Sequence, residues 1–291
     1  MKQRFIEYLQ YEKRYSPHTV TAYRTDLDQF YEYLHMQYSI DDIQSVNHPM
    51  IRSWLVELMN QEISPRSVNR KLTTLKSFYK FLQREGVTEV NPMRKITSPK
   101  TSKRLPVFVE KDKMERLLDE VDFGGGYTGL RDKLIIELFY ATGMRLSELV
   151  NLKETDLSFH HDTIKVTGKR NKERLIPFSH KMELLIKRYL DEKRSVFGEN
   201  GDLFLTDKGK KIYSRMVYRI VTGYLGMVTT LEKKSPHVLR HTFATHLLNN
   251  GAELNAIKEL LGHANLSATQ VYTHNTIDKL KSIYKQAHPK A

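Results

Sequence analysis

The stretch that decides how this chain is interpreted is residues 235–250, SPHVLRHTFATHLLNN. Ser235 followed by Pro236 is typical of a helix start, because serine caps free amides and proline fits the first turn. His237 and Arg240 lie three positions apart in that turn, so both project from one face near the positive helix end. An anion could bind there, since a planar guanidinium suits two phosphate oxygens. An ordinary amphipathic helix with His and Arg facing water is the alternative for this segment alone.

A second arginine follows an almost wholly apolar helix in residues 141–149, ATGMRLSEL. Gly143 breaks that helix, and Arg145 comes directly after the break. Glu148, one turn further on, either pairs with Arg145 as part of the structure or orients it as a second phosphate clamp. Both interpretations stay open at this point.

Further candidates lie on either side of these arginines. His263 follows Gly262 in residues 260–274, LLGHANLSATQVYTH, and Tyr272 comes nine residues later. Lys169 belongs to the turn of a hairpin whose strands are TIKVTG and RLIPF, beside Lys172 and Arg174. Phosphoryl transfer without a metal needs cations on the non-bridging oxygens, a nucleophile and an acid for the leaving oxygen. These residues could supply all three.

Other chemistries fit less well. His237 and His241 have the spacing of a zinc helix, but no Glu follows His237. The glycine-rich stretch GGGYTGLRD lacks the Gly-Lys-Ser/Thr ending of a P-loop, and no acidic cluster indicates a two-metal nuclease. We therefore expect no metal and no cofactor.

The composition favours a nucleic-acid partner. The 291 residues include 47 Lys and Arg against 34 Asp and Glu, a formal charge of +13. Membranes also attract basic proteins, but no apolar run is long enough to span one, and the first residues lack the core of a secretion signal. The absence of cysteine excludes disulfides and thiolate metal sites. We expect a cytoplasmic protein without a membrane partner.

The chain is expected to be mainly α-helical, in two domains. Residues 1–90 predict a bundle of four helices. Helix starts are expected at Ser16-Pro17, Asn47-His48-Pro49 and Ser64-Pro65, and Gly86 is expected to end the last helix. Residues 91–106, with three prolines and several basic residues, predict an extended linker. Residues 107–291 predict a mostly helical domain with a small antiparallel sheet, from helices near 110–121, 129–142, 179–194, 213–228, 236–249 and 253–261, and a final one through Ser282.

Together these segments resemble the tyrosine recombinase (phage integrase) family, and within it the Xer recombinases. The resemblance rests on ATGMRLSEL, TGKRNKERLIPF, HVLRHTFATHLLNNGA and LLGHANLSATQVYTH, in the family's order and spacing. SPHTVTAYRTDLDQF and SPRSVNRKLTTLKSFYKFL are similar to its core-binding domain, and the tail YKQAHPKA is similar to that of XerD-type members.

The resemblance implies a role for each candidate. Arg145 and Arg240 would clamp the phosphate, with Glu148 behind them, and His237 would be the general acid/base. His263 would donate a hydrogen bond to the same phosphate. Lys169 would protonate the 5′ oxygen, and Tyr272 would be the nucleophile. Candidate DNA contacts are Arg66, Arg70, Lys172 and Arg174.

The resemblance also implies partners. The two domains would form a clamp around a duplex recombination site, and four copies, alone or with a paralogue, would exchange strands through a Holliday junction. The helix after Tyr272 would insert into a neighbouring copy, or alternatively pack on its own domain. Chromosome dimer resolution with an FtsK-like translocase is the implied role, at the nucleoid.

Three rival functions stay open on the sequence. A mobile-element integrase shares the catalytic residues but usually carries an arm-binding domain, which we expect to be missing here. A type IB topoisomerase shares the chemistry but acts as a monomer. A non-catalytic DNA-binding protein would explain the charge but not the ordered set of catalytic-type residues.

Overall fold

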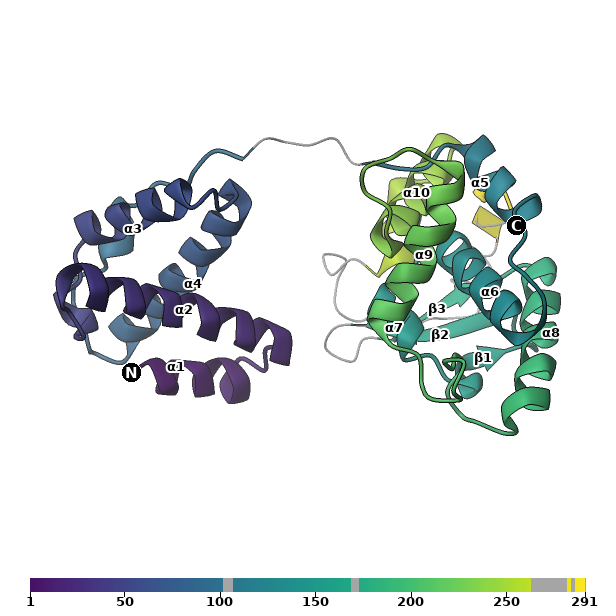
Figure 1. Ribbon diagram of the computed structural model, residues 1–291, viewed down its shortest axis with the longest axis horizontal. Coiled ribbons are helices and arrows are strands. Elements are labelled where there is room, and N and C mark those ends of the chain that lie inside the picture. The colour runs from purple at the N-terminus through teal and green to yellow at the C-terminus, as the bar shows by residue number, and fades with distance from the viewer. Residues whose placement is uncertain (102–106, 169–172, 263–281, 284–285, 291) are drawn as a thin grey trace. The chain divides into compact units, whose positions relative to one another are not determined.

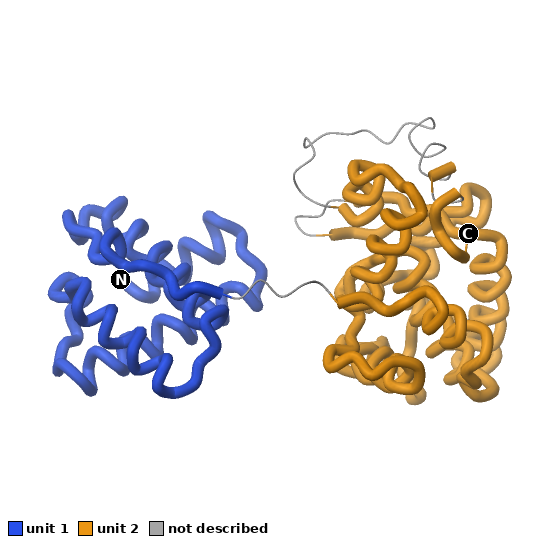
Figure 2. The backbone as a smooth tube through the Cα atoms, turned by 90° about the horizontal axis from the view of Figure 1, so that it is seen from above, with its two compact units in different colours: residues 1–104 blue, residues 105–291 orange. Residues whose placement is uncertain are grey.

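The computed structural model describes residues 1–101, 107–168, 173–262, 282–283 and 286–290. The chain forms two compact units, Met1–Arg104 and Leu105–Ala291, each with its own hydrophobic core (Figure 2). Both units are mainly helical, and the second contains a small sheet (Figure 1). The mainly α fold class is thereby confirmed.

The first unit is a helical bundle. Its helices are α1 (Lys2–Glu7), α2 (Pro17–Tyr38), α3 (His48–Asn60) and α4 (Pro65–Arg84), with a π-helical turn η1 (Tyr8–Glu12) and a 3₁₀ turn η2 (Ile43–Ser45). The side chains of Ser16, Asn47 and Ser64 accept backbone N–H bonds at the starts of α2, α3 and α4. Gly86, just beyond α4, has a φ of 68°. The predicted helix starts are confirmed.

The start of the expected linker differs from the prediction. Residues 91–96 belong to the first unit, where Pro92–Lys95 form a 3₁₀ turn, η3. Met93 and Ile96 are buried in the core of that unit, because two apolar side chains among basic neighbours gain more from burial than from an extended, solvated path.

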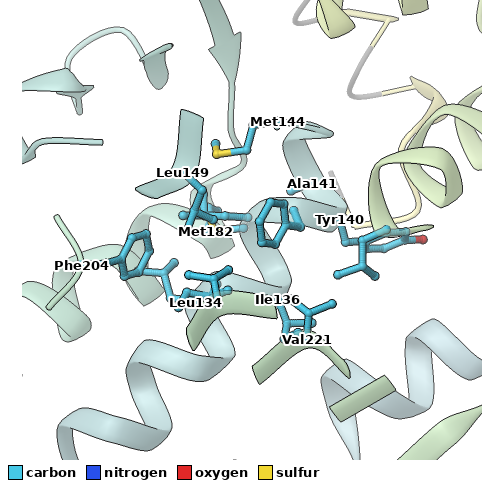
Figure 3. Close-up of a cluster of buried hydrophobic side chains, with 14 of the residues drawn as sticks. Leu134, Ile136, Tyr140, Ala141, Met144, Leu149, Met182, Phe204 and Val221 are labelled. Atoms are coloured by element: carbon cyan, nitrogen blue, oxygen red, sulfur yellow. The ribbon is translucent and has the colours of Figure 1, made fainter. Parts of the chain in front are cut away.

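The second unit is built around a helix that is mostly buried. Around α6 (Gly126–Thr142) pack α5 (Lys111–Asp119), α8 (His180–Phe197), α9 (Ser214–Val228) and α10 (Pro236–Asn249) (Figure 1). From Leu134 to Thr142 every residue of α6 is buried, and all but Glu137 and Thr142 are hydrophobic, because several helices pack around this part of it. Figure 3 shows Leu134, Ile136 and Tyr140 of α6 among side chains from other elements of this core.

The remaining elements lie along the edges of this core. They are α7 (Leu146–Val150), a 3₁₀ turn η4 (Glu154–Asp156), α11 (Leu254–Leu261), and the strands β1 (Leu157–Ser158), β2 (Thr163–Thr167) and β3 (Glu173–Pro177). The sheet is antiparallel in the order β1-β2-β3, with Ile164 paired to Ile176. The predicted hairpin is confirmed, whereas β1 is too short to give a periodic signal in the sequence.

The described end of the tail packs on its own unit. Ala287 is buried beside Phe243, its carbonyl accepts from Asn250 Nδ2 at 2.7 Å, and His288 Nε2 donates to the Tyr140 carbonyl at 3.0 Å. Most of the final helix expected through Ser282 lies outside the described residues. For residues 286–290, docking on the same unit is therefore what the structure shows. Among the described helices, none combines the length and apolarity that a bilayer span requires.

Candidate active site

A sharp turn after α6 places Arg145. Gly143 has a left-handed φ of 58°, and a Cβ there would lie 2.4 Å from the Phe243 ring, so only glycine fits. Arg145 becomes the N-cap of α7 with Glu148 at its third position. The Arg145 backbone N–H donates to Glu148 Oε2 and its Nη1 to Oε1, both at 2.7 Å. Glu148 thus holds both the backbone and the guanidinium of Arg145 by hydrogen bonds, while 32% of the Arg145 side chain stays exposed.

Arg240 joins two other helix ends. It lies on α10 and is 7% exposed. Its Nη1 donates to the Gly143 carbonyl and its Nη2 donates to the Leu261 carbonyl at 2.8 Å. The same guanidinium therefore ties α10 to the end of α6 and to the end of α11.

Arg174 does not lie where a DNA contact requires it. Its side chain is 5% exposed, and its Nη1 and Nη2 donate to both carboxylate oxygens of Glu148 at 2.9 and 2.8 Å. Its Nε donates to the Leu260 carbonyl at 2.9 Å. A buried guanidinium held in a bidentate ion pair is not available to a phosphate backbone, so the predicted DNA contact at Arg174 is corrected to an internal one.

Three arginines meet at the end of one helix. The last carbonyls of α11 and its cap accept from three different guanidiniums: Leu260 from Arg174, Leu261 from Arg240, and Gly262 from Arg145 at 3.1 Å. A helix C-terminus carries partial negative charge and unpaired carbonyls, so it is a suitable anchor for cations. Side chains 21 to 117 positions away along the chain are thereby gathered at one point.

The cluster has more positive than negative charge. Burial alone would raise the pKa of Glu148, but hydrogen bonds and charge from Arg174 and hydrogen bonds from Arg145 bring it down to about 2. Burial lowers the pKa of Arg240 to about 10, and the charges of Arg145 and Arg174 add to that effect. The cluster holds three guanidiniums and one carboxylate, and two of the guanidiniums pair with that carboxylate, so the cluster favours a bound anion.

Arg145, His237 and Arg240 line one hollow of about 420 Å³, which we call the arginine hollow. His241, one turn along α10 from His237, has a lowered pKa because of burial and the nearby His237. The hollow thus brings together three of the six predicted catalytic side chains, and its other lining residues are Met144, Leu146, Ser147, Ser214, Tyr218, Ser235 and Pro236.

Four of the other predicted site residues lie outside the described residues. They are Lys169, Lys172, His263 and Tyr272, so the roles expected of them stay predictions. Within the described part of the chain, no group of three or more His, Asp or Glu side chains is placed to hold a metal ion.

The two predicted DNA contacts of the first unit differ in how they are held. Arg66 is exposed on the first turn of α4. Arg70, one turn later, is 49% exposed and donates to Asp26, a fully buried carboxylate that also accepts from Lys71 and Thr74. Arg70 is therefore held at its base by an ion pair and presents its remaining edge to solvent.

The role of Arg174 and the polar lining of the arginine hollow were not predicted from the sequence. A signal for Arg174 existed, because it lies two residues before the buried Ile176 and so shares its inward face on β3. No comparable signal marks Ser214 or Tyr218, since their position at the hollow depends on how α9 packs.

Comparisons with known proteins show the family to which this chain belongs. Residues 107–279 match the Phage integrase family model, and residues 3–86 match the model described as Phage integrase, N-terminal SAM-like domain. The chain belongs to the phage integrase family. It is a tyrosine recombinase, an enzyme of site-specific DNA recombination.

Sequence similarity to relatives covers nearly the whole chain. The tyrosine recombinase XerC of Oceanobacillus iheyensis is 42% identical over 99% of this chain and 95% of its own length. That of Bacillus subtilis is 38% identical over 99% and 95%. Both relatives carry the name XerC, and the likeness of the tail to XerD-type members stays a prediction.

Solved structures share the fold. XerA recombinase is 26% identical with a TM-score of 0.50, covering 100% of this chain and 98% of that chain. XerH bound to its difH substrate before cleavage is 22% identical with a TM-score of 0.70, covering 98% and 84%. At that identity the XerH likeness concerns the fold alone.

Proposed function

We propose that this recombinase cuts and rejoins DNA through a 3′-phosphotyrosine at Tyr272. The Tyr272 oxygen attacks the scissile phosphorus, the bond to the 5′ oxygen breaks, and Lys169 gives that oxygen its proton. Arg145 and Arg240 hold the non-bridging oxygens with His263, and His237 accepts or returns the proton of the tyrosine. The phosphotyrosine conserves the energy of the phosphodiester, so the 5′-hydroxyl of a partner strand can reverse the step without ATP.

One observation carries this proposal. Arg145, His237 and Arg240 line the same open hollow, in a cluster that holds three guanidiniums and the single carboxylate of Glu148. Fixed positive charge aimed at the oxygens of a phosphate stabilises the charge that develops there during transfer.

The proposed partners follow from the reaction. The two units would hold a duplex recombination site between them, with Arg66, Arg70 and Lys172 among the DNA contacts. Four copies, or two copies with two of a paralogue, would pass through a Holliday junction. The relatives' name XerC supports a role in chromosome dimer resolution in the cytoplasm, with an FtsK-like translocase giving direction.

The test is covalent trapping on a suicide DNA substrate that loses a short fragment after cleavage. The unaltered protein is expected to form a covalent adduct in the presence of EDTA, because the clamp consists of arginine and histidine. Tyr272→Phe is expected to bind the DNA equally well and to form no adduct. Adduct in Tyr272→Phe would move the nucleophile to another residue. Cleavage that EDTA abolishes and magnesium restores would indicate nuclease chemistry instead.

A further inference from the structure

Arg174 connects three elements of the second unit. It belongs to β3, pairs with both carboxylate oxygens of Glu148 on α7, and donates to Leu260 at the end of α11. It is also packed against Gly262, where an added Cβ would lie 3.1 Å from its Cδ. None of these atoms lines the hollow itself.

The charge of Arg174 determines how strongly the Glu148 carboxylate attracts the guanidinium of Arg145. The Glu148 side chain is 1% exposed, so water does little to screen its charge. With Arg174 in a bidentate pair, the carboxylate is already neutralised, and Arg145 keeps a positive charge for an incoming anion. Without Arg174, Arg145 would be the main counter-ion of a buried carboxylate, and its charge would be drawn away from the hollow.

We propose that Arg174 is a positioning residue for strand cleavage. It contacts no DNA. It neutralises Glu148 so that the guanidinium of Arg145 can serve the scissile phosphate. The inference rests on the proposed function, because it assumes that Arg145 binds the phosphate.

The test compares two substrates. Arg174→Met removes the charge and keeps the length of the side chain. On ordinary suicide DNA the variant is expected to form the covalent adduct roughly 10²-fold more slowly, as small losses of position or charge at a phosphate clamp do. On DNA whose scissile phosphate is a neutral methylphosphonate, the charge of Arg145 matters less, so the variant should lag the unaltered protein by only a few-fold. DNA affinity should not change.

A matched control is Arg131→Met. Arg131 is another buried arginine of the same unit, 2% exposed and paired with Asp132 and Asp207, but it does not line the hollow. Its loss should lower the melting temperature without a difference between the two substrates. If Arg174→Met does not fold, a double variant is used instead. Combining Glu148→Gln with Arg174→Met removes both buried charges, and the double variant is compared with Glu148→Gln alone. Equal adduct rates in those two proteins are expected, since Arg174 then has no carboxylate to neutralise.

The outcomes separate the two proposals. Equal slowing of Arg174→Met on both substrates, or a loss of DNA affinity, would overturn the positioning role. A further large loss when Arg174→Met is added to Glu148→Gln would also overturn it. No adduct from the unaltered protein on ordinary DNA would instead overturn the proposed reaction at Tyr272.

Discussion

Gly262 and Arg174 touch: a Cβ built on Gly262 would lie 3.1 Å from both Cδ and Nη1 of Arg174, and Gly262 has a φ of 64°. Any other residue at 262 would meet backbone strain and a guanidinium that three hydrogen bonds hold in place. The end of α11 and the arginine cluster are therefore fitted to each other.

Gly262→Ala is expected to lower stability by about 1–3 kcal/mol, the usual range for a strained backbone position. It should also slow adduct formation, because Arg174 or the α11 end must shift. Chemical denaturation and suicide-substrate kinetics measure the two effects. Gly223→Ala on α9 is the control, since an added Cβ there meets nothing within 4 Å. Similar effects of both substitutions would show that the contact with Arg174 is unimportant.

Lys169→Ala is expected to slow cleavage of ordinary DNA by roughly 10²–10⁴-fold, the range of a lost general acid. DNA with sulfur in place of the 5′ bridging oxygen should be cleaved almost normally, because sulfur leaves without a proton. Single-turnover rates on the two substrates check this. Equal slowing would make Lys169 a DNA contact and transfer the acid role to Lys172 or a histidine.

Arg66→Ala with Arg70→Ala is expected to weaken DNA binding and to reduce its dependence on salt, by about one unit of slope for each phosphate that is no longer neutralised. Titrations at several salt concentrations measure both quantities. Arg84→Ala, at the opposite end of α4, is the control because its guanidinium lies over the ring of Tyr8. Unchanged affinity in the double variant would place the DNA-binding surface elsewhere.

Glu148 should make the second unit sensitive to acid. Its pKa, lowered from 4.5 to about 2, means that its ionised form adds stability above pH 4.5, which is lost as the pH falls toward 2. The contribution is about 3 kcal/mol. Glu148→Gln should flatten the fall of unfolding free energy over this range. Glu120→Gln, whose side chain is 72% exposed, should follow the unaltered protein. Parallel curves for all three proteins would contradict the ion-pair account.

Truncation after Asn275 should lower the melting temperature of the second unit, because Ala287 and His288 then no longer pack on Phe243 and Tyr140. Each kcal/mol of destabilisation corresponds to about 2–4 °C in a domain of this size. Lys290→Ala is the milder control, since it removes only the ion pair with Asp119. An unchanged melting temperature would mean that the tail adds nothing in cis. Assembly on paired sites, followed separately, tests the insertion into a neighbouring copy that the family resemblance implies.

The sequence predicted those features that depend on local chemistry. Helix starts at Ser16, Asn47 and Ser64 follow from capping and proline geometry, and the face shared by His237 and Arg240 follows from helical spacing. The pairing of Arg145 with Glu148 was one of two interpretations, and the structure contains that pair within the site.

Features that depend on tertiary packing escaped the prediction. Arg174 looked like a hairpin-tip cation because it follows a run of basic residues, yet its partners come from Glu148 and Leu260, 26 and 86 positions away. Met93 and Ile96 looked like linker residues because prolines surround them, and only the core of the first unit explains their burial.

Because three guanidiniums bond to the end of α11, the arginine hollow can stay assembled only while that short helix stays folded. α11 has eight residues, and a helix of that length is marginal unless its neighbours hold it. When its last turn opens, Arg145, Arg174 and Arg240 lose a partner at the same moment. Hydrogen exchange of the α11 amides therefore reports how long the hollow stays assembled, and DNA bound to Arg145 and Arg240 should slow that exchange.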